Sequence, residues 1–143
     1  MDDALEGWEK VNLDLLIEET FDETAEQFAD FNAEQMYAGE LNDGKRIKPP
    51  YRPSTVSIKK KKGQPTDRVT LRDKGDYHEG LTASRTGQEY EISSPVSYAE
   101  YIEKKYTLEI YSLNEEFMEK FKPVFNGVLA NKISDVSGLS FST

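Results

Sequence analysis

The chain has 143 residues, a net charge of −9 and no cysteine. This length fits one domain, and the lack of cysteine excludes a disulfide framework, a thiolate metal site and a cysteine nucleophile. Leu, Ile, Val and Phe supply only 32 residues, so we expect a thin core, supplemented by aromatic rings and by burial against a partner subunit. With no membrane-spanning apolar run and an acidic start unlike a signal peptide, the sequence predicts a soluble intracellular or particle-bound protein.

The charge is divided into three blocks along the chain. Residues 1–44 carry 14 acids and one base, residues 45–75 carry 11 bases and two acids, and residues 76–143 carry 11 acids and six bases. Because two blocks of three repel phosphate, DNA is disfavoured as the main ligand of the whole chain, although the middle block could touch phosphate locally. The middle block equally suits an acidic helix, in the same subunit or in a neighbour.

The first predicted element is a long amphipathic helix over residues 11–37, which follows an acidic arm at residues 1–9. Leu13, Leu16, Phe21 and Phe28 recur at helical spacing, and at about 1.5 Å per residue the helix would run roughly 40 Å. We expect this stripe to pack on an antiparallel sheet.

Residues 45–67 contain four of the six prolines and the run Lys59–Lys62. Proline lacks a backbone N–H and fixes φ, so this composition predicts an extended basic loop that excludes helix and allows at most a short strand at residues 55–59.

The remaining elements complete an α+β fold in a single domain, residues 1–143. Strand-like patterns occur at residues 68–72, 80–85, 88–93 and 108–113. The middle two flank Gly87 and predict an antiparallel hairpin.

A short helix is expected within residues 96–106. A second long helix should begin near Ser112 and Asn114, with Pro123 either kinking it or marking its first turn. Residues 134–143 are expected to form a flexible tail.

One cluster has residue types suited to a metal ion or to catalysis: Asp73, Asp76, His78 and Glu79. Its spacing does not match an EF-hand, and a single histidine cannot provide a His pair within one chain. Glycine-rich phosphate-binding patterns are also missing from the sequence. We therefore predict a solvated turn here, with no catalytic residue, no metal and no cofactor.

The second candidate site is an interface. Four adjacent ammonium groups can form a solvated loop, a protein-docking loop or a local DNA contact. Trp8 could anchor a neighbouring subunit or pack on the first helix. The residues of this interface hypothesis are Lys59, Lys60, Lys61, Lys62, Trp8, Glu18, Glu19, Asp22 and Glu23.

The order of these parts resembles the virion-morphogenesis family of tailed bacteriophages, which includes head–tail connector and tail-completion proteins. The resemblance covers residues 10–131 and rests on four motifs in sequence: Asn42-Asp43-Gly44, the proline stretch at residues 49–55 with Lys59–Lys62 after it, residues 71–81, and Tyr98-Ala99-Glu100-Tyr101-Ile102. This chain departs from the family pattern at Lys74 and Tyr77, where the family has Thr and Leu.

The resemblance implies a non-enzymatic structural subunit that forms a hexameric or dodecameric ring. Such a ring joins portal, connector or tail proteins in the neck or tail of the virion, after assembly in the host cytoplasm, and DNA passes through it without specific binding. An acidic chain suits this role because a negative lumen does not hold the duplex. The alternative is a cytosolic protein-binding module or inhibitor whose basic loop docks on an acidic partner. Neither interpretation involves a membrane.

Overall fold

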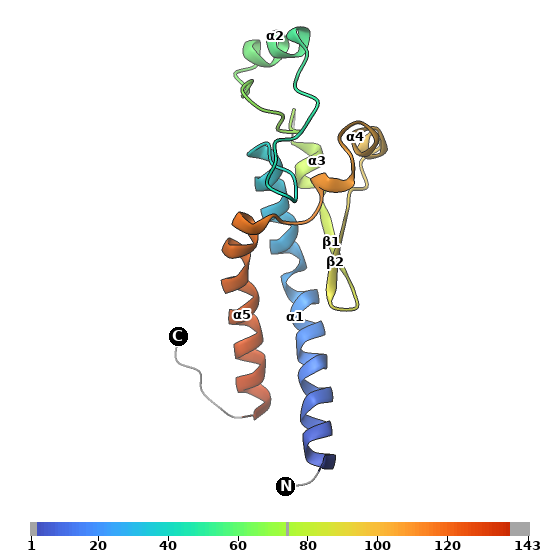
Figure 1. The fold of residues 1–143 in the computed structure, drawn as a ribbon, viewed down its shortest axis with the longest axis vertical. Helices are drawn as coiled ribbons and strands as arrows, with labels where there is room; N and C mark the ends of the chain where they lie inside the picture. Colours follow the sequence, from blue (N-terminus) through green and yellow to red (C-terminus); the bar gives the residue numbers. More distant parts are fainter. Residues whose placement is uncertain (1–2, 74, 138–143) are drawn as a thin grey trace.

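The computed structural model describes residues 3–73 and 75–137, with side chains for residues 13–73 and 75–135. Figure 1 shows an elongated molecule in which α1 and α5 lie side by side, the hairpin β1–β2 flanks α1, and α2 forms one end. We call the part built from α1, α5 and the hairpin the shaft. The elements in chain order are α1 (Asp3–Tyr37), α2 (Pro53–Lys61), α3 (Asp76–Glu79), β1 (Thr82–Thr86), β2 (Glu89–Ser93), α4 (Ala99–Tyr106), the 3₁₀ helix η1 (Leu108–Ile110) and α5 (Glu115–Ser137).

The predicted α+β class and the hairpin are confirmed. β1 and β2 pair antiparallel, with Ala83 opposite Ile92 and Arg85 opposite Tyr90.

The second long helix begins at the position predicted from its capping residue. The Asn114 Oδ1 accepts a hydrogen bond from the Phe117 N–H at 3.1 Å. Pro123 lies inside α5 and so does not mark its first turn. The predicted tail enters α5 as far as Ser137, and residues 138–143 lie outside the described part.

An aromatic cluster joins the three parts of the shaft. Phe28 of α1 is 2% exposed, stacks on Tyr90 of β2 at 4.1 Å between ring centroids and meets Phe121 of α5 edge-on at 5.3 Å. Phe21 packs against Tyr90 and Phe125 in the same cluster. Such pairs add to the free energy of burying the rings themselves, which compensates for the small number of aliphatic residues.

Two buried amides of α1 fix the segment that leads into α5. Asn32 donates to the Ile110 carbonyl at 3.0 Å and accepts from the Ser112 N–H at 2.9 Å. Gln35 donates to the Ser112 carbonyl at 2.9 Å and accepts from the Asn114 N–H at 2.7 Å. These side chains satisfy backbone groups that would otherwise be buried without partners, so they set the start of α5 relative to α1.

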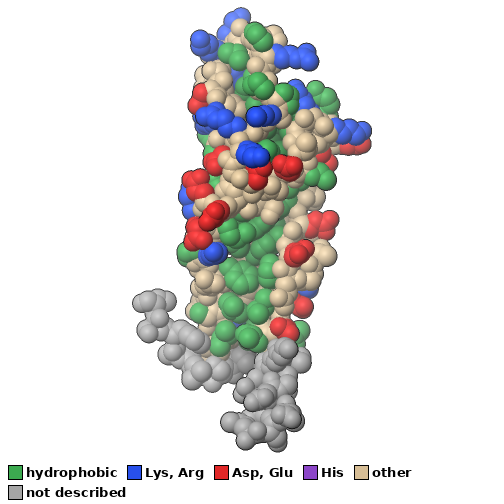
Figure 2. All heavy atoms as spheres, in the orientation of Figure 1, with side chains coloured by type: hydrophobic (Ala, Val, Ile, Leu, Met, Phe, Trp, Pro, Cys, Tyr) green, Lys and Arg blue, Asp and Glu red, His purple; other side chains and the backbone are tan. Residues whose placement is uncertain are grey.

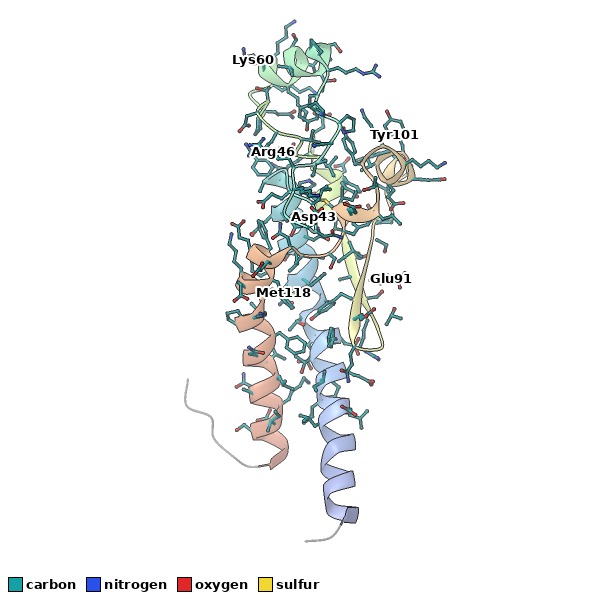
Figure 3. All side chains as sticks on the ribbon, in the orientation of Figure 1. Asp43, Arg46, Lys60, Glu91, Tyr101 and Met118 are labelled. Atoms are coloured by element: carbon teal, nitrogen blue, oxygen red, sulfur yellow. The ribbon has the colours of Figure 1, made fainter. Side chains whose placement is uncertain are left out.

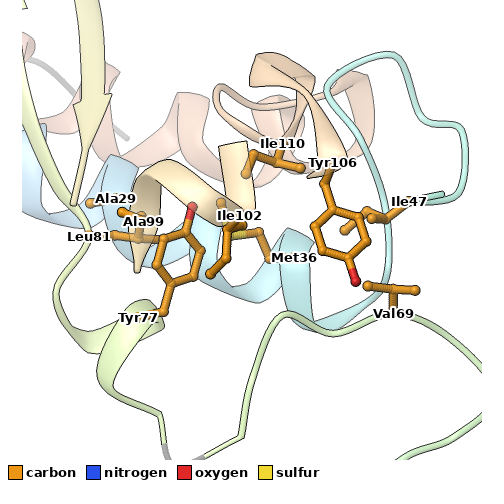
Figure 4. Close-up of a cluster of buried hydrophobic side chains, with 10 residues drawn as sticks. All are labelled: Ala29, Met36, Ile47, Val69, Tyr77, Leu81, Ala99, Ile102, Tyr106 and Ile110. Atoms are coloured by element: carbon orange, nitrogen blue, oxygen red, sulfur yellow. The ribbon is translucent and has the colours of Figure 1, made fainter. Parts of the chain in front are cut away.

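A second core lies where α1 ends and is closed by α3, α4 and η1 (Figure 4). Its buried members are Ala29, Met36, Ile47, Val69, Tyr77, Leu81, Ala99, Ile102, Tyr106 and Ile110.

The prediction that residues 45–67 exclude helix was wrong. Residues 53–61 form α2, and Pro53 occupies its first turn. Proline is tolerated there because the first helical N–H groups have no partner within the helix, and its fixed φ suits the helix. Arg52 is extended, as expected for a residue before proline. The prolines therefore define where this helix begins.

Two predicted strands are also absent from the described part of the chain. Residues 108–110 form η1, preceded by Thr107 with φ 69°, whose side chain accepts a hydrogen bond from the Glu109 N–H. Residues 68–72 are irregular, and Leu71 has φ 55°. Alternation of apolar and polar residues identifies one buried face but does not supply a neighbouring strand, and the described sheet has only two strands.

The predicted apolar stripe of the first helix is only partly buried. Leu13 is 43% exposed, whereas Thr20 and Thr24 are completely buried. Each threonine hydroxyl donates to the carbonyl four residues before it, and the Thr24 hydroxyl lies 2.6 Å from the Tyr90 hydroxyl. These short side chains are buried where α1 faces the hairpin, and hydrogen bonds satisfy their polar atoms.

Candidate functional site

The basic block folds into one end of the molecule, which we call the basic tip and define as residues 45–73. In Figure 2, Lys and Arg side chains gather at this end, whereas Asp and Glu lie further along the molecule. The tip contains α2, whose last turn carries Lys59, Lys60 and Lys61. Cations are favourable at a helix C-terminus because the last carbonyl groups carry partial negative charge.

The four lysines of the run have different environments. Lys59 is only 8% exposed, donates to the Arg72 carbonyl at 2.9 Å and to Gln64 at 3.3 Å, and lies 4.8 Å from the Tyr51 ring centroid. Lys62 forms an ion pair with Asp73 at 2.8 Å. Lys60 and Lys61 are exposed, and Figure 3 shows Lys60 on α2 at the end of the molecule. Half of the run therefore holds the tip together and half faces solvent.

Two arginines attach the basic tip to the end of α1. The Arg68 Nε donates to the Tyr37 carbonyl at 2.7 Å, and the Arg68 guanidinium lies 5.1 Å from the Tyr37 ring centroid. Arg72 lies 5.7 Å from the same ring. Stacking of guanidinium on an aromatic face is favourable, and the carbonyl contact satisfies a free acceptor at the helix end.

A cleft of about 470 Å³ lies between the basic tip and α4. We call it the tyrosine cleft. Tyr98 and Tyr101 are 44% and 66% exposed, and Figure 3 labels Tyr101 on α4. The residues lining it are Tyr51, Lys59, Leu71, Arg72, Asp73, Asp76, Tyr77, Tyr98, Tyr101, Ile102, Lys105 and Tyr106.

Burial and hydrogen bonding shift the pKa of some groups in the tyrosine cleft. Burial raises the pKa of Tyr77 to about 12, and its hydroxyl donates to Tyr111 at 2.7 Å. Hydrogen bonds from Lys62 and Gln64 hold the pKa of Asp73 below its ordinary value. Among the described residues, three cations line the cleft against two carboxylates, and Asp73 is already paired with Lys62. The cleft is thus an aromatic surface with an excess of positive charge.

The acidic residues named in the interface hypothesis lie on the shaft, away from the basic tip. Arg85 of the hairpin contacts Asp22 at 3.1 Å and Glu18 at 3.8 Å. Lys132 of α5 contacts Glu23 at 2.6 Å and Glu19 at 3.3 Å. Cations from the shaft itself therefore meet these carboxylates, and the interface they were predicted to form stays a prediction. Trp8 belongs to α1, but its side chain lies outside the described residues.

The prediction of a solvated turn around His78 was wrong, because Asp76–Glu79 form the short helix α3 and Tyr77 within it is buried. The His78 Nε2 lies 2.8 Å from the Thr70 carbonyl, and burial lowers the pKa of its imidazole. Asp73 forms its ion pair with Lys62, and Asp76 lines the tyrosine cleft. Among the described residues, no three His, Cys, Asp or Glu side chains are arranged to hold a metal ion.

The shaft carries a second candidate surface, an apolar groove of about 470 Å³ between α1, β2 and α5. Phe21, Tyr90, Met118 and Phe125 supply its apolar lining. Figure 2 shows a continuous band of apolar side chains along this face. Leu13 and Leu15 add exposed apolar area on α1, so the shaft has apolar surface that the described side chains leave open.

The sequence did not reveal the tyrosine cleft, because Tyr98 and Tyr101 occur at the same spacing as core residues of a short helix. The available signal was the spacing of Tyr98, Tyr101 and Lys105 at i, i+3 and i+7, which places an aromatic and cationic stripe on one side of α4. Ile102 and Tyr106, one residue further on, form the buried side.

Comparisons with protein-family models, with curated proteins and with solved structures find no match to this chain. None of the helices in the described part is long and apolar enough to cross a membrane.

Proposed function

We propose that this chain is a non-enzymatic structural subunit of a bacteriophage or prophage particle, forming a head–tail connector or tail-completion ring. The choice of particle rests on the resemblance of its motif order to the virion-morphogenesis family. The observation that carries the proposal structurally is the separation of charge along the molecule, with a basic tip at one end of an acidic shaft (Figures 1 and 2).

Opposite charges at two ends of a rigid subunit favour a head-to-tail contact. Such a contact joins two different surfaces, so it repeats from subunit to subunit and closes into a ring when the rotation permits. The 35-residue α1 keeps the two ends apart within one chain, at about 1.5 Å per residue. The basic tip therefore meets an acidic surface of its neighbour.

The open apolar groove of the shaft supports the same proposal. Large exposed apolar patches on a small protein are typical of interaction surfaces. A neighbouring subunit packed along α1 and α5 would cover the groove and supply burial that this thin core lacks. The carboxylates that stay exposed repel the phosphates of DNA, which favours free passage of the duplex through a ring.

Removing the protein from particles tests this function. Particles assembled without it should have filled heads and complete tails that stay unjoined, and supplying the chain in trans should restore joining. Joined, infectious particles that lack the protein would contradict the proposal.

The tyrosine cleft favours a second candidate, a protein-binding module, because exposed tyrosine rings beside arginine and lysine are typical of protein interfaces. A binding module would stay monomeric at every concentration and bind one acidic partner, whereas a ring subunit forms multimers or docks on particles.

A further inference from the structure

The tyrosine cleft has the features of a site for an acidic peptide segment that carries an aromatic anchor. Tyr98 and Tyr101 present exposed rings, and Lys59, Arg72 and Lys105 provide the cations. Aromatic side chains combined with Arg and Lys are typical of the central contacts of protein interfaces.

The charge of the cleft narrows the choice of ligand. A nucleic acid would bring its phosphates close to Asp73 and Asp76, which line the same cleft. A short peptide can place separate carboxylates beside Lys105 and Arg72 and an indole or phenyl ring against Tyr101. The cleft therefore favours a peptide over a polyanion.

One segment of this chain has that chemistry. Residues 1–9 contain four acids, Leu5 and Trp8, the single tryptophan of the protein. The backbone of this segment is helical from Asp3 onward.

The segment cannot reach the cleft of its own chain. Figure 1 shows the start of α1 at the opposite end of the molecule from α2 and α4. The intervening helix has 35 residues, which corresponds to roughly 50 Å. A contact between the segment and the cleft must therefore join two copies.

We propose that the tyrosine cleft binds the acidic N-terminal end of α1 from a second copy of the chain, with Trp8 as the anchor. This inference rests on the proposed ring function and names the head-to-tail contact of that ring. Lys60 and Lys61, exposed on the basic tip, attract the acidic segment, and the tyrosines hold Trp8.

The single tryptophan makes the contact measurable, because tryptophan-selective fluorescence of the full chain reports only on Trp8. The emission of the parent chain should shift to shorter wavelength as its concentration rises. The cleft variant, Tyr101→Ala with Lys105→Glu, should require at least about tenfold more protein for the same shift, since loss of an interface anchor typically costs more than 1 kcal/mol. The matched control, Leu108→Ala with Lys104→Glu, changes the same charge and an equally exposed side chain outside the cleft lining and should behave as the parent.

Mixing two deficient chains tests the direction of the contact. The cleft variant retains Trp8, and a Trp8→Ala chain retains the cleft but has no tryptophan. At the concentration at which the parent begins to assemble, each should stay monomeric alone, and together they should form a one-to-one complex with the shorter-wavelength emission. Failure of the mixture to associate, with both chains folded, would overturn the proposal.

Other outcomes separate this proposal from the ring function. If the parent assembles but the cleft variant assembles equally well with unchanged Trp8 emission, the cleft assignment is wrong and the ring function stands. If the parent never assembles, a peptide of residues 1–12 titrated onto the Trp8→Ala chain still tests the cleft. A lack of peptide binding at millimolar concentration would overturn the cleft proposal. Tighter binding of a single-stranded oligonucleotide than of the peptide at the cleft would overturn it as well.

Discussion

In the shaft, Phe28 and Phe121 are buried among aromatic rings from three elements, whereas in the basic tip Lys59, Arg68 and Arg72 provide many of the contacts. The shaft is stabilised mainly by removing apolar surface from water, which salt does not weaken. The tip contributes Ile47 and Val69 to the second core, and its other contacts are largely charge-assisted hydrogen bonds and cation–π contacts. This difference suggests that the shaft provides stability and the tip provides recognition.

The largest expected effect comes from the aromatic cluster of the shaft. Phe28→Ala should lower the free energy of unfolding by about 3–5 kcal/mol, because a buried ring is lost and the rigid neighbours Tyr90 and Phe121 cannot fill the cavity. Chemical denaturation measures the change. Leu15→Ala, on an exposed part of the same helix, should change it by less than about 0.5 kcal/mol. Equal effects of the two substitutions would show that the cluster is not the core of the shaft.

The buried amides of α1 should come next. Asn32→Ala leaves the Ile110 carbonyl and the Ser112 N–H without their partner, at a cost of about 2–3 kcal/mol. Glu34→Ala, on the exposed side of the same turn, is the matched control. A variant as stable as the parent in denaturant unfolding would mean that the segment before α5 is fixed by other contacts.

The local stability of the basic tip should fall when Lys59 is replaced and stay nearly unchanged when the neighbouring Lys60 is replaced. Lys59→Met removes two hydrogen bonds and a cation–π contact and should destabilise α2 by about 1–2 kcal/mol. Lys60→Met, at an exposed position, should have an effect within about 0.5 kcal/mol. Amide hydrogen exchange within α2 measures this local stability. Identical exchange in both variants would contradict the structural role of Lys59.

The smallest expected effect is on the pH dependence of the folding stability. Burial lowers the pKa of His78 in the folded state, so the unfolded chain takes up the proton first as the pH falls. The stability contributed by neutral His78 is complete above its unfolded pKa of about 6.5 and is lost as the pH falls through the lower folded value. His78→Gln should therefore lose less stability than the parent between about pH 7.5 and 5.5. Parallel losses in both proteins would assign the pH dependence to other groups.

Part of this structure follows from local patterns in the sequence. The helical spacing of α1, the turn at Gly87 and the cap at Asn114 depend on neighbouring residues, and the corresponding elements are present. The arrangement of the tip was not predictable in the same way, since the tip is attached to Tyr37 through Arg68 and Arg72, more than 30 residues away in the chain. The tyrosine cleft was missed because periodicity shows which residues share a face and does not show what covers it.

The central claim, that opposite ends of neighbouring chains meet, is tested most directly by the mass of the full-length protein in solution. Sedimentation or native mass spectrometry at low ionic strength should give one discrete multimer, a hexamer or dodecamer. This multimer should dissociate in about 1 M salt, where the Debye length falls to about 3 Å. Reversal of Lys60 and Lys61 to Glu should have the same effect, and reversal of the exposed Lys104 and Lys120, which line neither the groove nor the cleft, should not. A protein that stays monomeric at every concentration and salt, or a multimer that ignores salt and the tip reversal, would contradict the account.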